Sequence, residues 1–232
     1  MRMNNEINVM GVFEKLFGYY GPQGWWPGDG PLDVVFGAIL TQASAWTNVE
    51  LAIAGLKEAG CWSLSAIHRR PLHELAAIIR PCGYFNAKAR KLKAFAEHVH
   101  VHYGGNLSAF LGRNLDLLRE ELLSIHGIGP ETADDILVYG AEKPSFVIDS
   151  YTRRIMHRVG LITEERAAGY QTYQALFHDN LPRDASLFNE YHALLDHHAK
   201  VSCAKVPKCS GCCLEDVCAT GVARVSAGNQ PS

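Results

Sequence analysis

Helical periodicity of the apolar residues runs through most of this 232-residue chain and restricts its fold more than any other feature. The period-two alternation between hairpin turns that marks β-sheets is not seen, and glycine-containing breaks divide the chain into about ten helical segments. We therefore predict an all-α fold. The apolar residues that recur at three-to-four spacing include Leu51, Ile53 and Leu56, Leu75, Ile78 and Ile79, Leu92, Phe95 and Val99, Leu115, Leu118 and Leu122, and Leu187, Tyr191 and Leu194.

Composition is that of an ordinary globular protein, with 47% hydrophobic and 20% charged residues. The net charge of −2 counts mildly against nucleic-acid binding, although lysine and arginine gather locally over 80–93, 153–158 and 200–208. The first residues, 1–6, lack the apolar region of a signal peptide, and no apolar run approaches the roughly 20 residues of a membrane span. We expect a cytoplasmic protein with no membrane partner.

The segment 123–134, Leu-Ser-Ile-His-Gly-Ile-Gly-Pro-Glu-Thr-Ala-Asp, predicts two helices joined by a tight hairpin. Gly127 and Gly129 allow the backbone to turn sharply and to approach another molecule closely. Ile128 between them is the apolar contact that would join the helices. Pro130 suits the first turn of the second helix, whose free amides could bind a DNA phosphate. The alternative is an ordinary helix–helix turn.

Asp149 follows the apolar run Phe146–Ile148 and precedes a predicted helix. Aspartate in this position is a preferred N-cap, because its carboxylate accepts hydrogen bonds from free backbone amides. A capping carboxylate is also held rigidly, so the structural role is compatible with a catalytic one.

The hairpin, the Gly/Pro-containing loop and the downstream aspartate together resemble the endonuclease III (helix-hairpin-helix–Gly/Pro–Asp) superfamily of DNA glycosylases, over about residues 8 to 218. The resemblance implies that Asp149 is the catalytic carboxylate, which would stabilise the oxocarbenium charge that develops as an N-glycosidic bond breaks and orient the attacking water.

Glu131 departs from the pattern of those members of the superfamily that also nick the DNA backbone. They have a lysine in this position, whose amine attacks C1′ and forms a Schiff base. A carboxylate cannot form an imine, so we predict a monofunctional hydrolase and regard Glu131 as a surface group favoured by the helix dipole. The adenine-mismatch branch is disfavoured because Gly37 occupies the position of its catalytic glutamate.

Four cysteines near the C-terminus, Cys203, Cys209, Cys212 and Cys218, lie within 16 residues in the order Cys-x5-Cys-x2-Cys-x5-Cys. In an intracellular chain such a group predicts a metal site rather than disulfides, and the spacing alone leaves zinc and iron–sulfur open. The family resemblance implies a [4Fe–4S] cluster, although the family commonly has one more residue in the first gap. Cys213 is a competing ligand with poorer spacing.

Several loops resemble the DNA-contacting and base-binding loops of the superfamily. Gln42 in Ile39–Ala43 matches a glutamine that inserts into DNA, and Tyr84, followed by Lys88, occupies a second inserting loop. Residues of the base pocket resemble the 3-methyladenine branch, in which an aromatic sandwich binds a cationic base by stacking and cation–π attraction of roughly 0.5–2 kcal/mol. The corresponding residues are Trp25, Trp26, Pro27 and Trp46. The structural alternatives are core tryptophans, a buried amide and a packed aromatic.

Two lobes are predicted: residues 31–133 as a helical barrel with the hairpin, and 1–30 with 134–218 as a cluster lobe, with Asp149 in the cleft between them and 219–232 as a disordered tail. We expect a monomer that excises an alkylated purine such as 3-methyladenine from damaged double-stranded DNA. Two alternatives stay open, a glycosylase for mismatched thymine or uracil, and a catalytically silent DNA-binding iron–sulfur protein.

Overall fold

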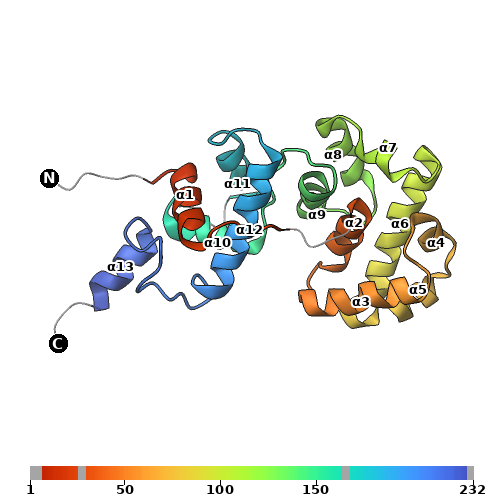
Figure 1. The fold of residues 1–232 in the computed structure, drawn as a ribbon, viewed down its shortest axis with the longest axis horizontal. Helices are drawn as coiled ribbons and strands as arrows, with labels where there is room; N and C mark the ends of the chain where they lie inside the picture. The colour runs from red at the N-terminus through yellow and green to blue at the C-terminus, as the bar shows by residue number, and fades with distance from the viewer. Residues whose placement is uncertain (1–6, 26–29, 164–167, 229–232) are drawn as a thin grey trace. The chain divides into compact units, whose positions relative to one another are not determined.

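The computed structural model describes residues 7–25, 30–163 and 168–228, and within these ranges every regular element is helical. This agrees with the predicted all-α class. Figure 1 shows the helices in chain order. Their bounds are α1 Val9–Tyr20, α2 Pro31–Leu40, α3 Trp46–Glu58, α4 Leu64–Arg69, α5 Leu72–Ile78, η1 Arg80–Cys82, α6 Phe85–Tyr103, α7 Leu107–Leu111, α8 Leu115–Ser124, α9 Pro130–Asp135, η2 Ile136–Gly140, α10 Ser150–Val159, α11 Tyr170–His178, α12 Ala185–Val201 and α13 Ala219–Gly228.

The chain divides into two compact units, Trp26–Lys143 and Met1–Trp25 with Pro144–Ser232. In the first unit, α2 is the central element, and after Asp33 in its first turn it is apolar on all sides, as a helix surrounded by others must be. Six of its residues are between 0 and 4% exposed, namely Val34, Val35, Phe36, Ala38, Ile39 and Leu40. The long helix α6 lies against α4 and α5 (Figure 1).

Residues 134–143 belong to the first unit, whereas the sequence prediction assigned them to the cluster lobe. The physical reason is that α9 continues into the π-helical turn η2, which packs against α2. Gly140 lies so near Val34 that a Cβ added to it would be 3.3 Å from the valine Cγ1 atom. This contact holds the segment beside the barrel core.

In the second unit, α1 packs on α12, and α12 packs on α10. Tyr191 of α12 is completely buried and donates a 2.8 Å hydrogen bond to the carbonyl of Val9. Phe146 stacks on Phe177 with ring centroids 3.6 Å apart. An aromatic core thus supports the segment that leads to Asp149.

The C-terminal prediction was wrong, because residues 219–228 form α13 where a disordered tail was expected. The helix contacts α10, and Gly221 lies close enough to Glu215 that a Cβ there would be 3.0 Å from the glutamate carbonyl. Low hydrophobicity had suggested disorder, but contact with α10 orders the segment.

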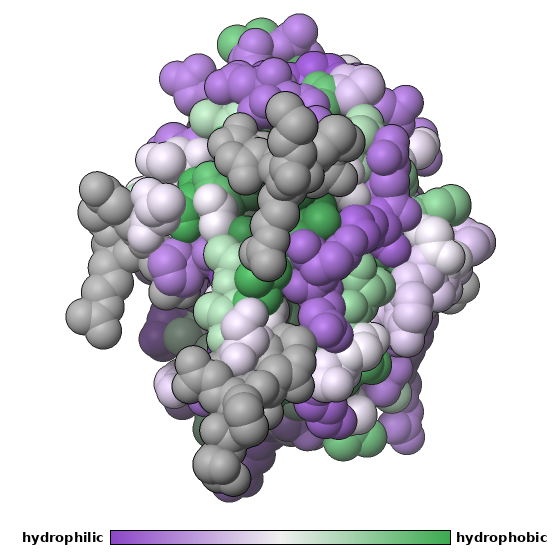
Figure 2. Space-filling model, turned by 90° about the vertical axis from the view of Figure 1, so that its left-hand side faces the viewer, coloured by the Kyte–Doolittle hydropathy of each residue, from purple (hydrophilic) through white to green (hydrophobic). Residues whose placement is uncertain are grey.

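The surface shown in Figure 2 carries small separate hydrophobic patches among hydrophilic residues. Among the described residues, no helix combines the length and apolar character required to cross a bilayer.

Candidate functional site

Asp149 caps α10, as the sequence predicted. Its Oδ1 atom accepts a 2.7 Å hydrogen bond from the Thr152 amide, which fixes the direction of the carboxylate. The side chain is 19% exposed, so part of the carboxylate still reaches solvent. The extended run before it is anchored by a 2.9 Å hydrogen bond from the Phe146 amide to Nε2 of His178. The result is a rigid, accessible carboxylate at the start of α10.

His192 lies beside Asp149 and was not singled out from the sequence. Its Nε2 atom is 3.9 Å from Oδ2 of Asp149, and its side chain is 7% exposed. Burial lowers the pKa of His192, while the nearby carboxylates of Asp149 and Asp196 act in the opposite direction. No local motif marks this histidine, because the contact joins α12 to the loop before α10.

Trp25 contacts His192, with ring centroids 5.7 Å apart at an interplanar angle of 46°. One of the four predicted pocket residues therefore packs on the histidine that lies beside the predicted catalytic carboxylate. Trp26 and Pro27 lie outside the described residues. Trp46 is half-buried at the start of α3 in the other unit, where its Nε1 donates a 2.9 Å hydrogen bond to Glu50.

The predicted hairpin joins α8 and α9. Gly127 has a φ of 85°, which only glycine adopts without strain, and Ile128 is 5% exposed within the barrel core. Gly129 has an ordinary φ of −93° and is exposed, so the turn itself does not require glycine at this position. Arg119 of α8 makes bidentate hydrogen bonds of 2.8 and 3.0 Å to the fully buried Asp134 of α9. This pair, which sequence reasoning missed, braces the hairpin.

Gln42 is held against the hairpin. Its Nε2 donates to the carbonyl of Gly127 at 3.2 Å and to the Thr132 hydroxyl at 2.8 Å. Its Oε1 accepts a hydrogen bond from the Lys91 ammonium. The aliphatic part of Lys91 also covers Gly127, and a Cβ at that glycine would be 2.3 Å from the lysine Cγ. Both ends of the amide are therefore engaged in this structure.

Lys88 is not a DNA contact, which corrects the sequence prediction. It is 1% exposed, and its ammonium donates 2.7 Å hydrogen bonds to the carbonyls of Leu40 and Cys82. These residues end α2 and η1, so Lys88 satisfies carbonyls that helix ends leave without a partner. Burial lowers the pKa of this lysine. Tyr84, by contrast, is 74% exposed in the left-handed conformation at φ 45°.

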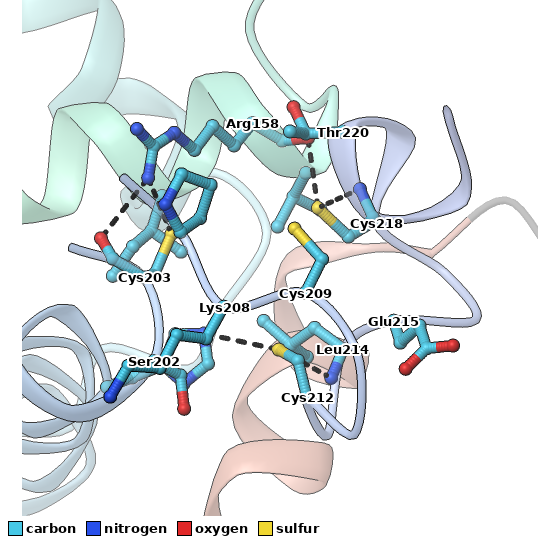
Figure 3. Close-up of a pocket in the computed structure, with 15 residues that line it drawn as sticks. Arg158, Ser202, Cys203, Lys208, Cys209, Cys212, Leu214, Glu215, Cys218 and Thr220 are labelled. Atoms are coloured by element: carbon cyan, nitrogen blue, oxygen red, sulfur yellow. Dashed lines mark hydrogen bonds between the residues drawn. The ribbon is translucent and has the colours of Figure 1, made fainter. Parts of the chain in front are cut away.

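The four predicted cysteine ligands line one pocket with Arg158 and His198, and Figure 3 shows their sulfur atoms around a common space. Hydrogen-bond donors reach three of the sulfurs: Arg158 to Cys203 at 3.3 Å, the Leu214 amide to Cys212 at 3.5 Å and the Gly221 amide to Cys218 at 3.4 Å. Such donors stabilise thiolates, which are the form that binds iron–sulfur clusters. The donor set therefore fits a cluster.

Electrostatics at Cys203 and Cys212 also favour thiolates. Burial by itself would raise the pKa of Cys203, but hydrogen bonds from His198 and Arg158 outweigh it and lower that pKa. A hydrogen bond from Cys213 is the main reason that the pKa of Cys212 falls to about 4. At Cys218, by contrast, burial raises the pKa of the thiol.

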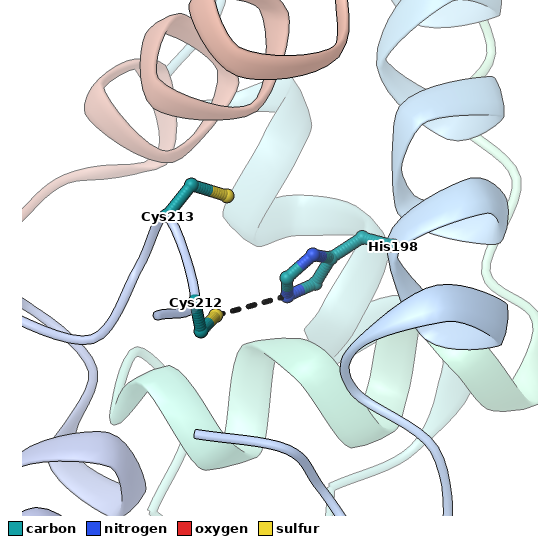
Figure 4. Close-up of side chains that lie close together, drawn as sticks. All are labelled: His198, Cys212 and Cys213. Atoms are coloured by element: carbon teal, nitrogen blue, oxygen red, sulfur yellow. Dashed lines mark hydrogen bonds between the residues drawn. The ribbon is translucent and has the colours of Figure 1, made fainter. Parts of the chain in front are cut away.

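A second donor set shares Cys212 with the first. The ligand atoms of His198, Cys212 and Cys213 lie within 4.8 Å of one another, and Figure 4 shows the histidine facing the two cysteines. Nε2 of His198 is 3.8 Å from the sulfur of Cys212, and Nδ1 is 2.9 Å from the Tyr20 hydroxyl. Neither His198 nor Tyr20 was predicted at this site, because both come from other helices.

An all-helical fold with a glycine hairpin and an aspartate that caps a later helix defines a class of DNA repair protein. The chain belongs to the HhH-GPD superfamily of base excision DNA repair proteins, whose family model matches residues 36–180, and it is a DNA repair glycosylase of that family. The predicted superfamily and enzyme class are thereby confirmed.

The chain is 39% identical to a protein of Methanocaldococcus jannaschii assigned as a DNA repair glycosylase, over 94% of this chain and 99% of that protein. It is 31% identical to a thymine/uracil-DNA glycosylase of Pyrobaculum aerophilum, over 63% of this chain and 62% of the relative. Its fold is similar to that of H. pylori 3-methyladenine DNA glycosylase, solved with 1,N6-ethenoadenine, with a TM-score of 0.72, 24% identity and coverage of 84% and 98%.

Proposed function

We propose that the chain is a monofunctional DNA N-glycosylase that hydrolyses the glycosidic bond of a flipped, alkylated purine such as 3-methyladenine in damaged double-stranded DNA. The observation that carries this proposal is the carboxylate of Asp149, held by the Thr152 amide at 2.7 Å and still 19% exposed. A fixed anion in that state can stabilise a sugar cation without first reorganising.

Hydrolysis at this site needs few catalytic groups. As the base departs with the bonding electrons, positive charge spreads over C1′ and the ring oxygen of the sugar, and Asp149 faces that charge. Water adds to C1′ and gives up its proton, for which the same carboxylate is the acceptor. A cationic N3-methylated adenine leaves as a neutral molecule, so a strong general acid is not required.

The absence of an amine at position 131 supports hydrolysis without strand cleavage. Glu131 is exposed in the first turn of α9, where the helix dipole favours a carboxylate. Borohydride trapping of the purified protein on DNA with pre-formed abasic sites should give no covalent adduct. A trapped adduct together with efficient nicking would refute the monofunctional assignment.

We assign DNA contacts to the hairpin residues Gly127 to Gly129, to Gln42 and to Tyr84. The exposure and left-handed backbone of Tyr84 suit a side chain that enters DNA. Gln42 is engaged with Gly127, Thr132 and Lys91, so its insertion would require these hydrogen bonds to be exchanged for contacts with DNA. We also propose base-binding roles for Trp25, Trp26, Pro27 and Trp46.

We further propose that Cys203, Cys209, Cys212 and Cys218 hold a [4Fe–4S] cluster. When bound, the cluster would act as a cross-link for the 203–218 segment rather than as a reactant, and this segment also carries Lys205 and Lys208 toward a phosphate backbone. Iron and acid-labile sulfide in anaerobically purified protein, with the brown colour of a cluster, would support the assignment. Stoichiometric zinc without iron would refute it.

A glycosylase for mismatched thymine or uracil is the second candidate. The 31% identity to the Pyrobaculum aerophilum thymine/uracil-DNA glycosylase favours it, and Asp149 would do the same chemistry there.

Excision from a panel of duplexes separates the two candidates. The panel contains 3-methyladenine, 7-methylguanine, hypoxanthine, and thymine or uracil opposite guanine, and base release is measured with the wild type and with Asp149→Asn. We expect release of alkylated purines by the wild type only, with the affinity for an abasic-site analogue retained in the variant. Activity restricted to the mismatches would replace the first candidate by the second.

A further inference from the structure

We propose that His192 is a positioning residue for Asp149 and connects the catalytic carboxylate to the base-binding side chain Trp25. This inference rests on the proposed function and deepens it. The two carboxylate oxygens have different neighbours: Oδ1 accepts the Thr152 amide at 2.7 Å, and Oδ2 faces Nε2 of His192 at 3.9 Å. The carboxylate is thus confined from two directions.

His192 is itself fixed by its surroundings. Its side chain is 7% exposed, and its ring centroid is 5.7 Å from that of Trp25 and 6.5 Å from that of Phe146. Because burial excludes water from this side of Asp149, the local dielectric is low, and the attraction between the carboxylate and a sugar cation is strengthened. A neutral imidazole leaves the negative charge of Asp149 available for that attraction.

Protonation of His192 would weaken the attraction between the Asp149 carboxylate and the sugar cation. An imidazolium beside Oδ2 would form an ion pair with Asp149 and compete with the sugar for its charge. The charged groups that face His192 are Asp149, from the loop before α10, and Asp196 and Lys200, from its own helix; Trp25 and Phe146 present uncharged rings. Burial lowers the pKa of His192, so the neutral form prevails at neutral pH and the ion pair forms only on acidification.

The test is single-turnover release of 3-methyladenine from methylated duplex DNA over about pH 5 to pH 8, the range in which histidines titrate. Wild type should lose activity on acidification, by on the order of 100-fold once His192 is protonated, given the strength of a partly buried charge pair. Because the glutamine of His192→Gln stays neutral, the loss of activity on acidification should be smaller in this variant or should occur at lower pH. His197→Gln is the matched control, because His197 lies on the same helix and packs on Tyr20.

Affinity for a duplex with an abasic-site analogue should stay within about twofold of the wild type in His192→Gln, because the imidazole acts through Asp149. If His192→Gln loses activity on acidification in the same way as the wild type, the proposal is overturned.

A second measurement does not depend on a folded His192 variant. The ring protons of His192 are titrated by NMR in the wild type and in Asp149→Asn. Loss of the carboxylate should move the titration of His192 to lower pH, and an unchanged titration would overturn the proposal. Failure of the proposed function would show differently, as no excision of any duplex by the wild type, whereas this coupling tests the contact between the two side chains by itself.

Discussion

Replacement of Lys88 by methionine tests whether this lysine is an internal brace or a DNA contact. Methionine has nearly the same length and keeps the packing, but it removes the ammonium from the carbonyls of Leu40 and Cys82. Each carbonyl would be left buried without its donor, at a cost of about 1–3 kcal/mol. The relief from burying an ammonium offsets part of this cost.

We expect Lys88→Met to lower the free energy of unfolding by about 3 kcal/mol, which for a domain of this size corresponds to a decrease in Tm of roughly 10 °C. Arg90→Met is the matched control, since Arg90 is exposed on the same helix, and it should change stability by less than about 0.5 kcal/mol. Both values come from urea denaturation followed by circular dichroism.

DNA binding distinguishes the two roles of Lys88. The slope of log Kd against log salt, measured with a duplex that carries an abasic-site analogue, should be the same for Lys88→Met and the wild type, because the buried ammonium neutralises no phosphate. A slope smaller by about 1 in Lys88→Met, with an unchanged free energy of unfolding, would refute the structural role of Lys88 and support a phosphate contact.

Three further variants probe the hairpin and the cysteine pocket. Arg119→Met leaves Asp134 charged and fully buried, so urea denaturation should show a loss of about 3–5 kcal/mol, and retention of wild-type stability would exclude a structural pair. Gly127→Ala places a Cβ at φ 85° and 2.3 Å from Cγ of Lys91, which would have to move. We expect a loss of at least about 1–2 kcal/mol in the same assay and weaker binding of the abasic analogue; an unchanged protein would mean that the hairpin tolerates other turns. Arg158→Met removes the 3.3 Å hydrogen bond to the sulfur of Cys203 and the 2.6 Å bond to the carbonyl of Ala204, so purified protein should retain less metal by elemental analysis, and full occupancy would argue against the role of Arg158 in the pocket.

The fold class and the local motifs were predictable from the sequence because each depends on residues near one another in the chain. Helical periodicity predicted the all-α class, and the glycines of 127–129 and the N-cap Asp149 are where the sequence placed them. The predicted lobe boundary after residue 133 and the predicted disorder of residues 219–228 were wrong. Both features depend on helices that pack on distant partners, η2 on α2 and α13 on α10.

Residue types alone determined that this chain would be helical, would turn at a glycine hairpin and would cap α10 with a carboxylate, since these choices follow from backbone propensities over a few residues. Only the tertiary structure decided which side chains surround these motifs. It buried Lys88 beneath two helix ends, engaged Gln42 with the hairpin and placed His192 beside Asp149. Such contacts depend on how helices pack, and a pattern of neighbouring residues carries no information about a partner dozens of positions away.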